Sequence, residues 1–466
     1  MKAWPTILLA IVAGCTMGPD YRRPETPAVE AFSETPEPWK VAQPRDDIAR
    51  GNWWEVFGDP QLNDLITKID VSNQTLAASE AQFRQTLAAL GISRAALFPT
   101  LDANATVVRS HSPGSTLGGT TAGRTVTSYG GRFTAQWEID LWGRVRRSVE
   151  SAEAAARASS ADVGAARLSL QAQLATSYFQ LRSLDAQARL LDDTVGALRK
   201  SLELTENRYR AGVVARSDVV QADAQLKSTL VQTIDLGVQR AQLEHAIAVL
   251  TGVPPAQLRI SRSDSFETEV PIVPPGVPSA LLERRPDVAA AERRVHASNA
   301  QIGVAKAAYF PQITLTGVYG ATSPDVSLFF VGASRTWSIG PSIAQSIFDA
   351  GLRRSQTEQA IAAYDATVAN YRQVTLTAFQ EVEDNLAALR ILEEEARSEA
   401  DAVEAARLSL SLVLNQYKAG TVSFLNVVTA QTALLNEERN AVGIQVRRLA
   451  AVVALIKALG GGWHEG

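Results

Sequence analysis

Two stretches of the chain are almost free of the residues that end helices. Residues 352–419 contain no glycine and no proline, and residues 144–211 contain only Gly164 and Gly196. At a rise of 1.5 Å per residue, each stretch would form a helix about 100 Å long. Arginine, glutamine and glutamate recur throughout both stretches, so we expect these helices to cross an aqueous space and not a bilayer.

The spacing of apolar residues in the first stretch favours helices that pack as a supercoil. The apolar positions recur mostly every three or four residues, which is the repeat of a coiled coil. They are Leu174, Tyr178, Leu181, Leu184, Ala188, Leu191, Val195, Leu198 and Leu202.

The chain also repeats itself. The phrase NRYRAG at 207–212 returns as NQYKAG at 415–420, and GISRAALFP at 91–99 returns as GVAKAAYFP at 303–311. Fixed self-similarity of this kind indicates that one supersecondary unit occurs twice. We therefore predict two repeats, residues 51–252 and 279–466, with a proline-rich linker at 253–278.

Each repeat has the same expected order of elements. It opens with a helix, at 60–97 in the first copy and 286–309 in the second, and it closes with a very long helix, a short break and another helix. Between them lie two segments in which Thr, Val, Tyr and Trp alternate with other residues, bounded by turn residues, which predicts one β-hairpin per repeat. The predicted strands are 100–110, 124–139, 312–322 and 334–348.

Four strands are too few to close a barrel, and open strand edges do not survive in lipid. If the chain crosses a membrane with these strands, several copies must combine their strands into one closed barrel. Bacterial outer-membrane barrels have even strand numbers from eight upward. Three copies would supply twelve strands, although the residues alone do not force that number.

The amino terminus reads as a lipoprotein signal. Residues 1–14 combine a basic start, an apolar run and small residues before Cys15, which is the single cysteine of the chain. The phrase VAGC looks like a lipobox, so we expect a palmitate-bearing lipid on Cys15, and Thr16 in place of an aspartate favours sorting to the outer membrane. The alternative is a free thiol beside an anchor helix, but the apolar run is shorter than the roughly 18–20 residues that span a bilayer. Residues 15–50 are rich in Pro, Glu and Asp and predict an extended tether.

Composition argues against several other classes of protein. The net charge is −4 with no dominant basic patch, so nucleic acid is not an expected partner. The four histidines lack ligand spacing, and there is no glycine-rich phosphate loop. We therefore predict no metal, no cofactor other than the covalent lipid, and no enzymatic activity.

Six stretches spread along the chain carry a family resemblance: GDPQLNDLI, DLWGRVRR, LLERRPDVAAAE, AKAAYFPQITL, YKAGTVSFLNVVTAQ and KALGGGW. Together they resemble the TolC-like outer membrane factor family, in its NodT-type lipoprotein branch. The resemblance implies a mainly α fold with β: a homotrimer in which four strands per protomer complete a 12-stranded barrel in the outer membrane, and long antiparallel helices form an α-barrel in the periplasm. It also implies the outer-membrane channel of a tripartite efflux system, which exports small molecules and works with a periplasmic adaptor and an inner-membrane pump of the RND type.

The resemblance places the two repeated phrases at the helix-hairpin tips that point into the periplasm. A glycine at the end of a helix accepts a left-handed conformation at little cost, and Ser217 or Asp218, and Ser423, are expected to cap the helices that follow. The alternative is that these residues simply make good turns. The residues predicted to meet the adaptor are Gly212, Val213, Gly420 and Thr421.

Members of the family close the tip with an interprotomer network of Asp, Tyr and Arg and with a ring of acids. Asp218 and Tyr417 match positions of that network, but Val422 stands at the arginine position. Asn426 and Thr429 stand at the acidic positions. We therefore predict a gate that is weaker and more hydrophobic, and Arg216 is a candidate for the missing arginine.

The competing interpretation is a periplasmic coiled-coil adaptor or scaffold lipoprotein, because long helical hairpins occur there too. The paired β-hairpins distinguish the two, since a scaffold has no need of them.

Overall fold

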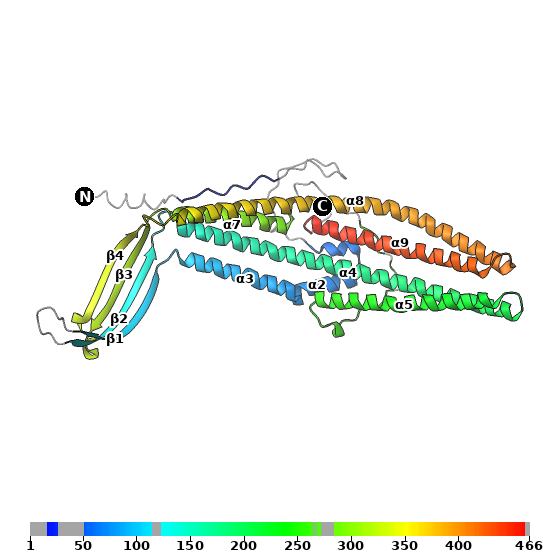
Figure 1. Ribbon diagram of the computed structural model, residues 1–466, viewed down its shortest axis with the longest axis horizontal. Coiled ribbons are helices and arrows are strands. Elements are labelled where there is room, and N and C mark those ends of the chain that lie inside the picture. The colour runs from blue at the N-terminus through cyan, green and yellow to red at the C-terminus, as the bar shows by residue number, and fades with distance from the viewer. Residues whose placement is uncertain are drawn as a thin grey trace. The chain divides into compact units, whose positions relative to one another are not determined.

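The computed structural model, shown in Figure 1, describes residues 16–26, 51–113, 123–263, 266, 268–271 and 284–461. The predicted signal peptide, Cys15 and most of the predicted tether lie outside these residues. The chain divides into two compact units. Unit 1 comprises Met1–Glu25, Gln82–Ser160 and Ala290–Tyr371, and unit 2 comprises Thr26–Ala81, Ala161–Ala289 and Arg372–Gly466. Each unit therefore contains residues of both repeats.

The two long helices form as the sequence predicts. Helix α4 runs over Arg144–Arg210 and helix α8 over Leu352–Ala419, and each contributes residues to both units. In unit 2, α4 is followed by α5 (Arg216–Leu250), and α8 is followed by α9 (Phe424–Ala458). The predicted coiled-coil positions are used: Leu184, Ala188 and Leu191 of α4 form one apolar cluster with Leu236 of α5 and Leu435 of α9.

The helix predicted over 60–97 is in fact two helices, so that prediction was wrong. Helix α2 spans Pro60–Ser72 and helix α3 spans Gln74–Ala95. Between them Asn73 is extended and buried, its side-chain amide donates to the carbonyl of Leu250 over 2.7 Å, and its side-chain oxygen accepts from the Leu76 N–H over 2.8 Å. The chain therefore breaks where a side chain can satisfy both a new helix and a distant helix end.

The other short helices follow the sequence closely. The carboxylate of Asp59 accepts from the N–H groups of Gln61 and Leu62, and Pro60 takes the first helical position of α2. In the second repeat, α7 spans Pro286–Ala307, close to the predicted 286–309. Single turns of 3₁₀ helix, η1 (Trp53–Phe57) and η2 (Pro255–Gln257), complete this part of the chain. Among the described helices, none combines the length and apolar character that a membrane crossing requires.

A buried ion network in unit 2 holds the start of the linker against the helices. Asp185 of α4 is 1% exposed and receives Arg182 at 3.0 Å and Arg240 of α5 at 2.7 Å. The same two arginines donate to the backbone carbonyls of Ser261 and Ile260, each over 2.7 Å. The linker therefore begins as a docked segment, because its carbonyls satisfy buried guanidinium groups.

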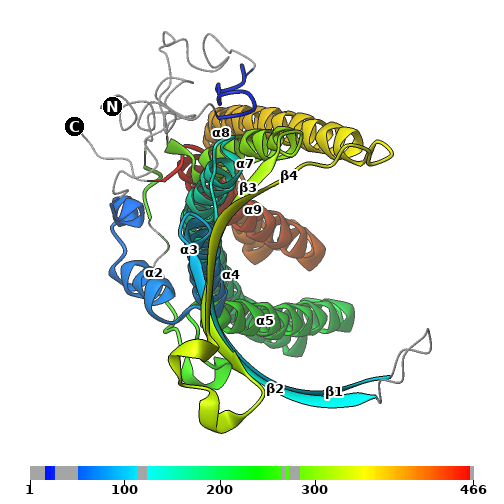
Figure 2. The same cartoon turned by 90° about the vertical axis from the view of Figure 1, so that its left-hand side faces the viewer.

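All four predicted strands form, and they make one antiparallel sheet in unit 1. The order is β1 (Thr100–Ser112), β2 (Arg124–Glu138), β3 (Gln312–Ser323) and β4 (Arg335–Ala344). The last strand is shorter than predicted. The two hairpins join because β2 pairs with β3, with Phe133 opposite Tyr319. Strands β1 and β4 are the edges of this sheet, which is curved in Figure 2.

Candidate functional site: the helical tips and the strand face

Both long helices end in the same hydrogen-bonded motif. Gly212 has φ of 69° and Gly420 has φ of 78°. In each copy the glycine N–H donates to the carbonyl three residues back and the next N–H donates to the carbonyl five residues back, over 2.9 to 3.0 Å. This is the Schellman arrangement, which needs a left-handed residue. The glycine prediction is confirmed at both tips.

The predicted caps are only partly confirmed. Helix α5 begins at Arg216, so Ala215 is its N-cap residue, and Ser217 and Asp218 already lie in the first turn. Ser423 does take the N-cap position of α9, but its hydroxyl makes no capping bond and lies 3.4 Å from Asn426 Oδ1. The turns therefore rely on backbone bonds, and Asp218 interacts favourably with the helix dipole as a first-turn acid.

The interior of the tips is an apolar cluster that joins all four long helices of unit 2. Its buried members are Ala222, Tyr417, Phe424 and Val427, and Tyr417 is 2% exposed. The rings of Tyr417 and Phe424 meet edge to face with centroids 5.5 Å apart. The half-buried Val422 packs against the same cluster. Of the five predicted gate residues, the structure thus brings Tyr417 and Val422 together.

An arginine that the sequence did not single out holds this cluster from α4. The guanidinium carbon of Arg208 lies 4.7 Å from the centroid of the Tyr417 ring, and Arg208 Nη1 donates to the Tyr417 carbonyl over 2.5 Å. The hydroxyl of Thr205, also on α4, lies 3.2 Å from the Tyr417 hydroxyl. The sequence did contain a hint of this role. Arg208 aligns with Gln416 in the repeated phrase, and the two copies differ at this position although the residues around it are alike.

The remaining predicted residues lie at the surface of the tips. Asp218 is half-buried, and Asn426 and Thr429 are exposed on α9, where the Thr429 hydroxyl donates to the carbonyl of Leu425 over 3.0 Å. The four residues predicted to meet an adaptor are exposed: Gly212, Val213, Gly420 and Thr421. Val213 is 62% exposed, which presents an apolar side chain at the end of the first hairpin.

The four-stranded sheet has two chemically different faces. One face is apolar on every strand and carries Leu101, Val107, Tyr129, Phe133, Trp137, Ile313, Leu315, Tyr319, Trp337, Ile339 and Ile343. The other is mostly polar and carries Asp102, Asn104, Thr106, Ser128, Arg132, Thr134, Gln136, Thr314, Thr316, Thr336, Ser338 and Ser342. Trp337 is 75% exposed and Ile339 is 69% exposed, so much of the apolar face lies open among the residues that the structure describes. Alternation of this kind is typical of a membrane β-barrel strand with lipid on one side and water on the other.

Residues 16–25 belong to unit 1 and are held there by a backbone hydrogen bond, an ion pair and a ring contact. The Met17 N–H donates to the Trp142 carbonyl over 3.0 Å. Arg147, which is 5% exposed on its side chain, binds Asp20 at 2.9 Å. Tyr21 stacks on His296 with centroids 4.3 Å apart. The segment that follows Cys15 is therefore fixed beside the start of α4.

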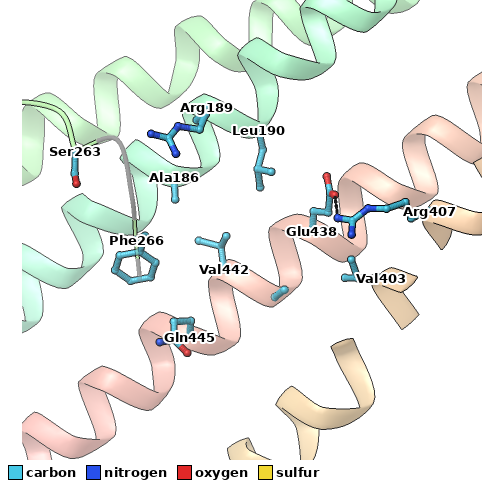
Figure 3. A pocket seen from close by; sticks show the side chains of 11 residues that line it. Ala186, Arg189, Leu190, Ser263, Phe266, Val403, Arg407, Glu438, Val442 and Gln445 are labelled. Atoms are coloured by element: carbon cyan, nitrogen blue, oxygen red, sulfur yellow. Dashed lines mark hydrogen bonds and ion pairs between the residues drawn. The ribbon is translucent and has the colours of Figure 1, made fainter. Parts of the chain in front are cut away.

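A pocket in unit 2 lies where α4, α8, α9 and the linker meet (Figure 3). Its cavity volume is about 430 Å³, and Leu190, Phe266, Val403 and Val442 give it an apolar lining. Two polar groups at its wall are already satisfied, because Glu438 pairs with Arg407 at 2.7 Å and Gln445 donates to the Thr268 carbonyl over 2.7 Å. The pocket is therefore an apolar gap between helices of unit 2, and its lining does not suggest a catalytic centre.

Comparisons with known proteins agree with the sequence resemblance. A model of the outer membrane efflux protein family matches residues 65–253 and 277–461, more than half of the chain. The toluene efflux pump outer membrane protein TtgC of Pseudomonas putida is 32% identical over 458 residues, which are 98% of this chain and 94% of TtgC. Outer membrane protein OprJ of Pseudomonas aeruginosa is 31% identical over 462 residues, which are 99% of this chain and 96% of OprJ. The solved structure of the outer-membrane channel OprN has a TM-score of 0.86 and 33% identity, and the match covers 96% of this chain and 100% of that chain. The chain therefore belongs to the outer membrane efflux protein family, whose members are transport channels of the outer membrane and not enzymes.

Proposed function

We propose that three copies of this chain form the exit channel of a tripartite efflux system. The observation that carries this proposal is the sheet with one apolar and one polar face. Four strands with two free edges cannot stand alone in lipid, but three such sheets paired edge to edge make a closed barrel of twelve strands. The apolar face then meets lipid, and the polar face lines an aqueous lumen.

The helical hairpins extend this channel into the periplasm and carry its partner surface. Their exposed ends, with Val213 on the first hairpin and Thr421 on the second, are the surface that would meet a periplasmic adaptor, itself coupled to an inner-membrane pump of the RND type. The exported compounds would be small molecules, since a relative such as TtgC is named for a pump that expels toluene.

A lipid on Cys15 would anchor the same assembly, as in the NodT-type branch. Support comes from the next residues, because the Met17 N–H is bound to Trp142 shortly before α4 begins. A covalent lipid at that place would enter the membrane leaflet nearest the periplasm and add to the hold of the barrel.

The closed state of the tip would depend on apolar packing more than on charge. Tyr417 and Phe424 are buried in the tip cluster, whereas Asn426 and Thr429 replace the acids of the family pattern. Arg208 supplies the cation that holds Tyr417, from a position different from the one the family pattern suggests. Opening would then require the second hairpin to separate from this arginine.

The assembly is tested by purification and reconstitution. We expect detergent-dependent solubility, a trimer that dissociates on heating in gel electrophoresis, and channels in planar bilayers. A monomer that stays soluble without detergent would contradict the proposal.

The partner surface is tested separately by cross-linking. Val213→Cys, placed at the exposed tip, should cross-link to a co-purified adaptor, whereas Ser398→Cys, exposed on α8 well before the helix ends at Ala419, should not. Equal cross-linking at both positions would argue against docking at the tip.

A further inference from the structure

The outer part of the apolar strand face is hollowed into a groove. Its cavity volume is about 490 Å³. The floor consists of small residues, among them Ala105 of β1 and Gly131 of β2, and Phe133 and Tyr319 line one part of it. The far wall is the connection between β3 and β4, which brings Phe329 and Phe330 over the sheet.

The connection between β3 and β4 has regular turns and internal hydrogen bonds. It contains the 3₁₀ turns η3 (Val326–Leu328) and η4 (Gly332–Ser334). The carboxylate of Asp325 accepts from the Ser327 N–H over 2.9 Å, and the Ser334 hydroxyl donates to the Leu328 carbonyl over 2.7 Å. Figure 2 shows the connection folded on the convex side of the sheet.

A glycine in β2 allows the connection to pack closely on the sheet. A Cβ on Gly131 would lie 2.8 Å from Cζ of Phe329, so only a glycine lets the ring approach this closely. Phe329 and Phe330 then meet edge to face at 5.1 Å, and Phe330 remains 86% exposed. The groove is therefore apolar and open along its length.

Its position on the strands corresponds to one edge of a membrane. From Ile313 to Ala321 a tilted strand rises about 20 Å along a barrel axis, against an apolar band of about 25 Å. On β3 and β4 the groove lies at Ala321 and Arg335, the ends that meet in the connection, away from the ends that lead to the helices. On β1 it lies at Ala103–Ala105, and the strand continues beyond it to Ser112. If the helices lie in the periplasm, as proposed above, this end is at the outer leaflet.

The groove also carries a positive charge. Arg335 opens β4 opposite Ala321, lines the groove and is exposed. The nearest carboxylate of the connection, Asp325, is engaged with the N–H and the hydroxyl of Ser327. An arginine above an apolar trough matches a ligand with a phosphate above acyl chains.

We propose that this groove binds one phosphorylated, multiply acylated glycolipid of the outer leaflet, of the lipid A class. An acyl chain would lie on Ala103 and Ala105 beside the aromatic rings that line the groove, and a phosphate would bind Arg335. Each trimer would hold three such lipids on its outside. The inference rests on the proposed barrel, since it requires the convex face to meet lipid.

The test uses the full-length trimer in detergent and native mass spectrometry. The probe is hexa-acylated bisphosphorylated lipid A, compared with the same lipid without phosphates. We expect up to three lipid A molecules per trimer, and binding at least about tenfold weaker without the phosphates, because a hydrogen bond to a charged group contributes about one factor of ten or more.

Two variants separate the headgroup from the chain. Arg335→Ala should weaken lipid A binding about tenfold and leave the dephosphorylated lipid unaffected. Ala105→Leu fills the trough with an apolar side chain that a lipid-facing strand tolerates, and it should reduce the binding of both lipids. Arg84→Ala, an exposed arginine of α3 outside the sheet, is the matched control and should change neither.

Bilayer conductance of the same preparations distinguishes this inference from the proposed function. If the variants form normal channels but bind lipid A like the unmodified protein, the groove is not a lipid site. If Ala105→Leu instead dissociates the trimer and leaves lipid binding unchanged, the groove is a contact between copies, and the inference is overturned. If the unmodified protein forms no channel at all, the barrel itself is wrong.

Discussion

Removing the guanidinium of Arg208 tests whether one side chain of α4 holds the second hairpin in its closed position. In Arg208→Ala the cation over the Tyr417 ring and the bond to the Tyr417 carbonyl are lost together. A cation–π contact contributes about 0.5–2 kcal/mol and a hydrogen bond from a charged donor about 1.5–3 kcal/mol. Because Arg208 is only half-buried, we take the low end of both, about 2 kcal/mol in total.

A free energy of that size shifts the equilibrium for local opening of the tip by about thirtyfold. Hydrogen exchange of intact protein in detergent measures this shift directly, in the amides around Tyr417 and Phe424. We expect their exchange to be faster by up to that factor and the channel to show a larger or more frequent open conductance in planar bilayers.

The chain offers two matched variants. Arg210→Ala removes the same side chain two residues away, where it is exposed and hydrogen-bonded to Asn207, and it should leave the tip unchanged. Arg208→Gln gives the first repeat the residue of the second, keeps a donor for the carbonyl and loses the cation, so its effect should be intermediate. If Arg208→Ala exchanges like the unmodified protein, or if Arg210→Ala has an equal effect, Arg208 does not hold the tip.

Three further predictions concern charge elsewhere in unit 2. Asp185→Asn should lower the free energy of unfolding by about 3 kcal/mol in denaturant titrations, because it leaves the buried Arg182 without its carboxylate and removes the nearer of the two carboxylates that pair with Arg240, whereas Glu438→Ala at an exposed pair should cost less than about 1 kcal/mol. Burial, and then the hydrogen bond with Glu437, raise the pKa of Glu399 above its ordinary 4.5, so its contribution to stability is present below that pH and is lost as the pH rises through the raised value. Glu399→Gln should therefore flatten the fall in Tm that begins as the pH rises above about 4.5, and an unchanged slope would refute it. Asp218→Ala should raise channel conductance if this acid takes part in closing the tip. Unchanged conductance would show that Asp218 only interacts with the dipole of α5 as an acid of its first turn.

The long helices and their ends could be predicted because their causes are local. The absence of glycine and proline from 352–419 and the glycine at 420 act through the backbone of a few neighbouring residues, and the structure ends α8 at Ala419. The strands were predictable for the same reason, since alternation along ten residues decides which face meets lipid. The family followed from motifs spread along most of the chain.

Packing decided what depends on residues far apart in the sequence. The break at Asn73 needs the carbonyl of Leu250, and nothing in the helical pattern around Asn73 signals that partner. The hold on Tyr417 needs Arg208, about two hundred residues earlier in the chain, and the sequence directed attention to Arg216 instead.

The groove on the strand face shows most clearly which features are local in the sequence and which depend on tertiary packing. The sequence by itself determined that the strands have an apolar face, because that property repeats every second residue. Only the tertiary structure decided that the β3–β4 connection folds back on this face, that Gly131 admits Phe329, and that Arg335 stands at the same edge. Contacts of this kind depend on which surfaces meet in space, and a one-dimensional pattern carries no record of them.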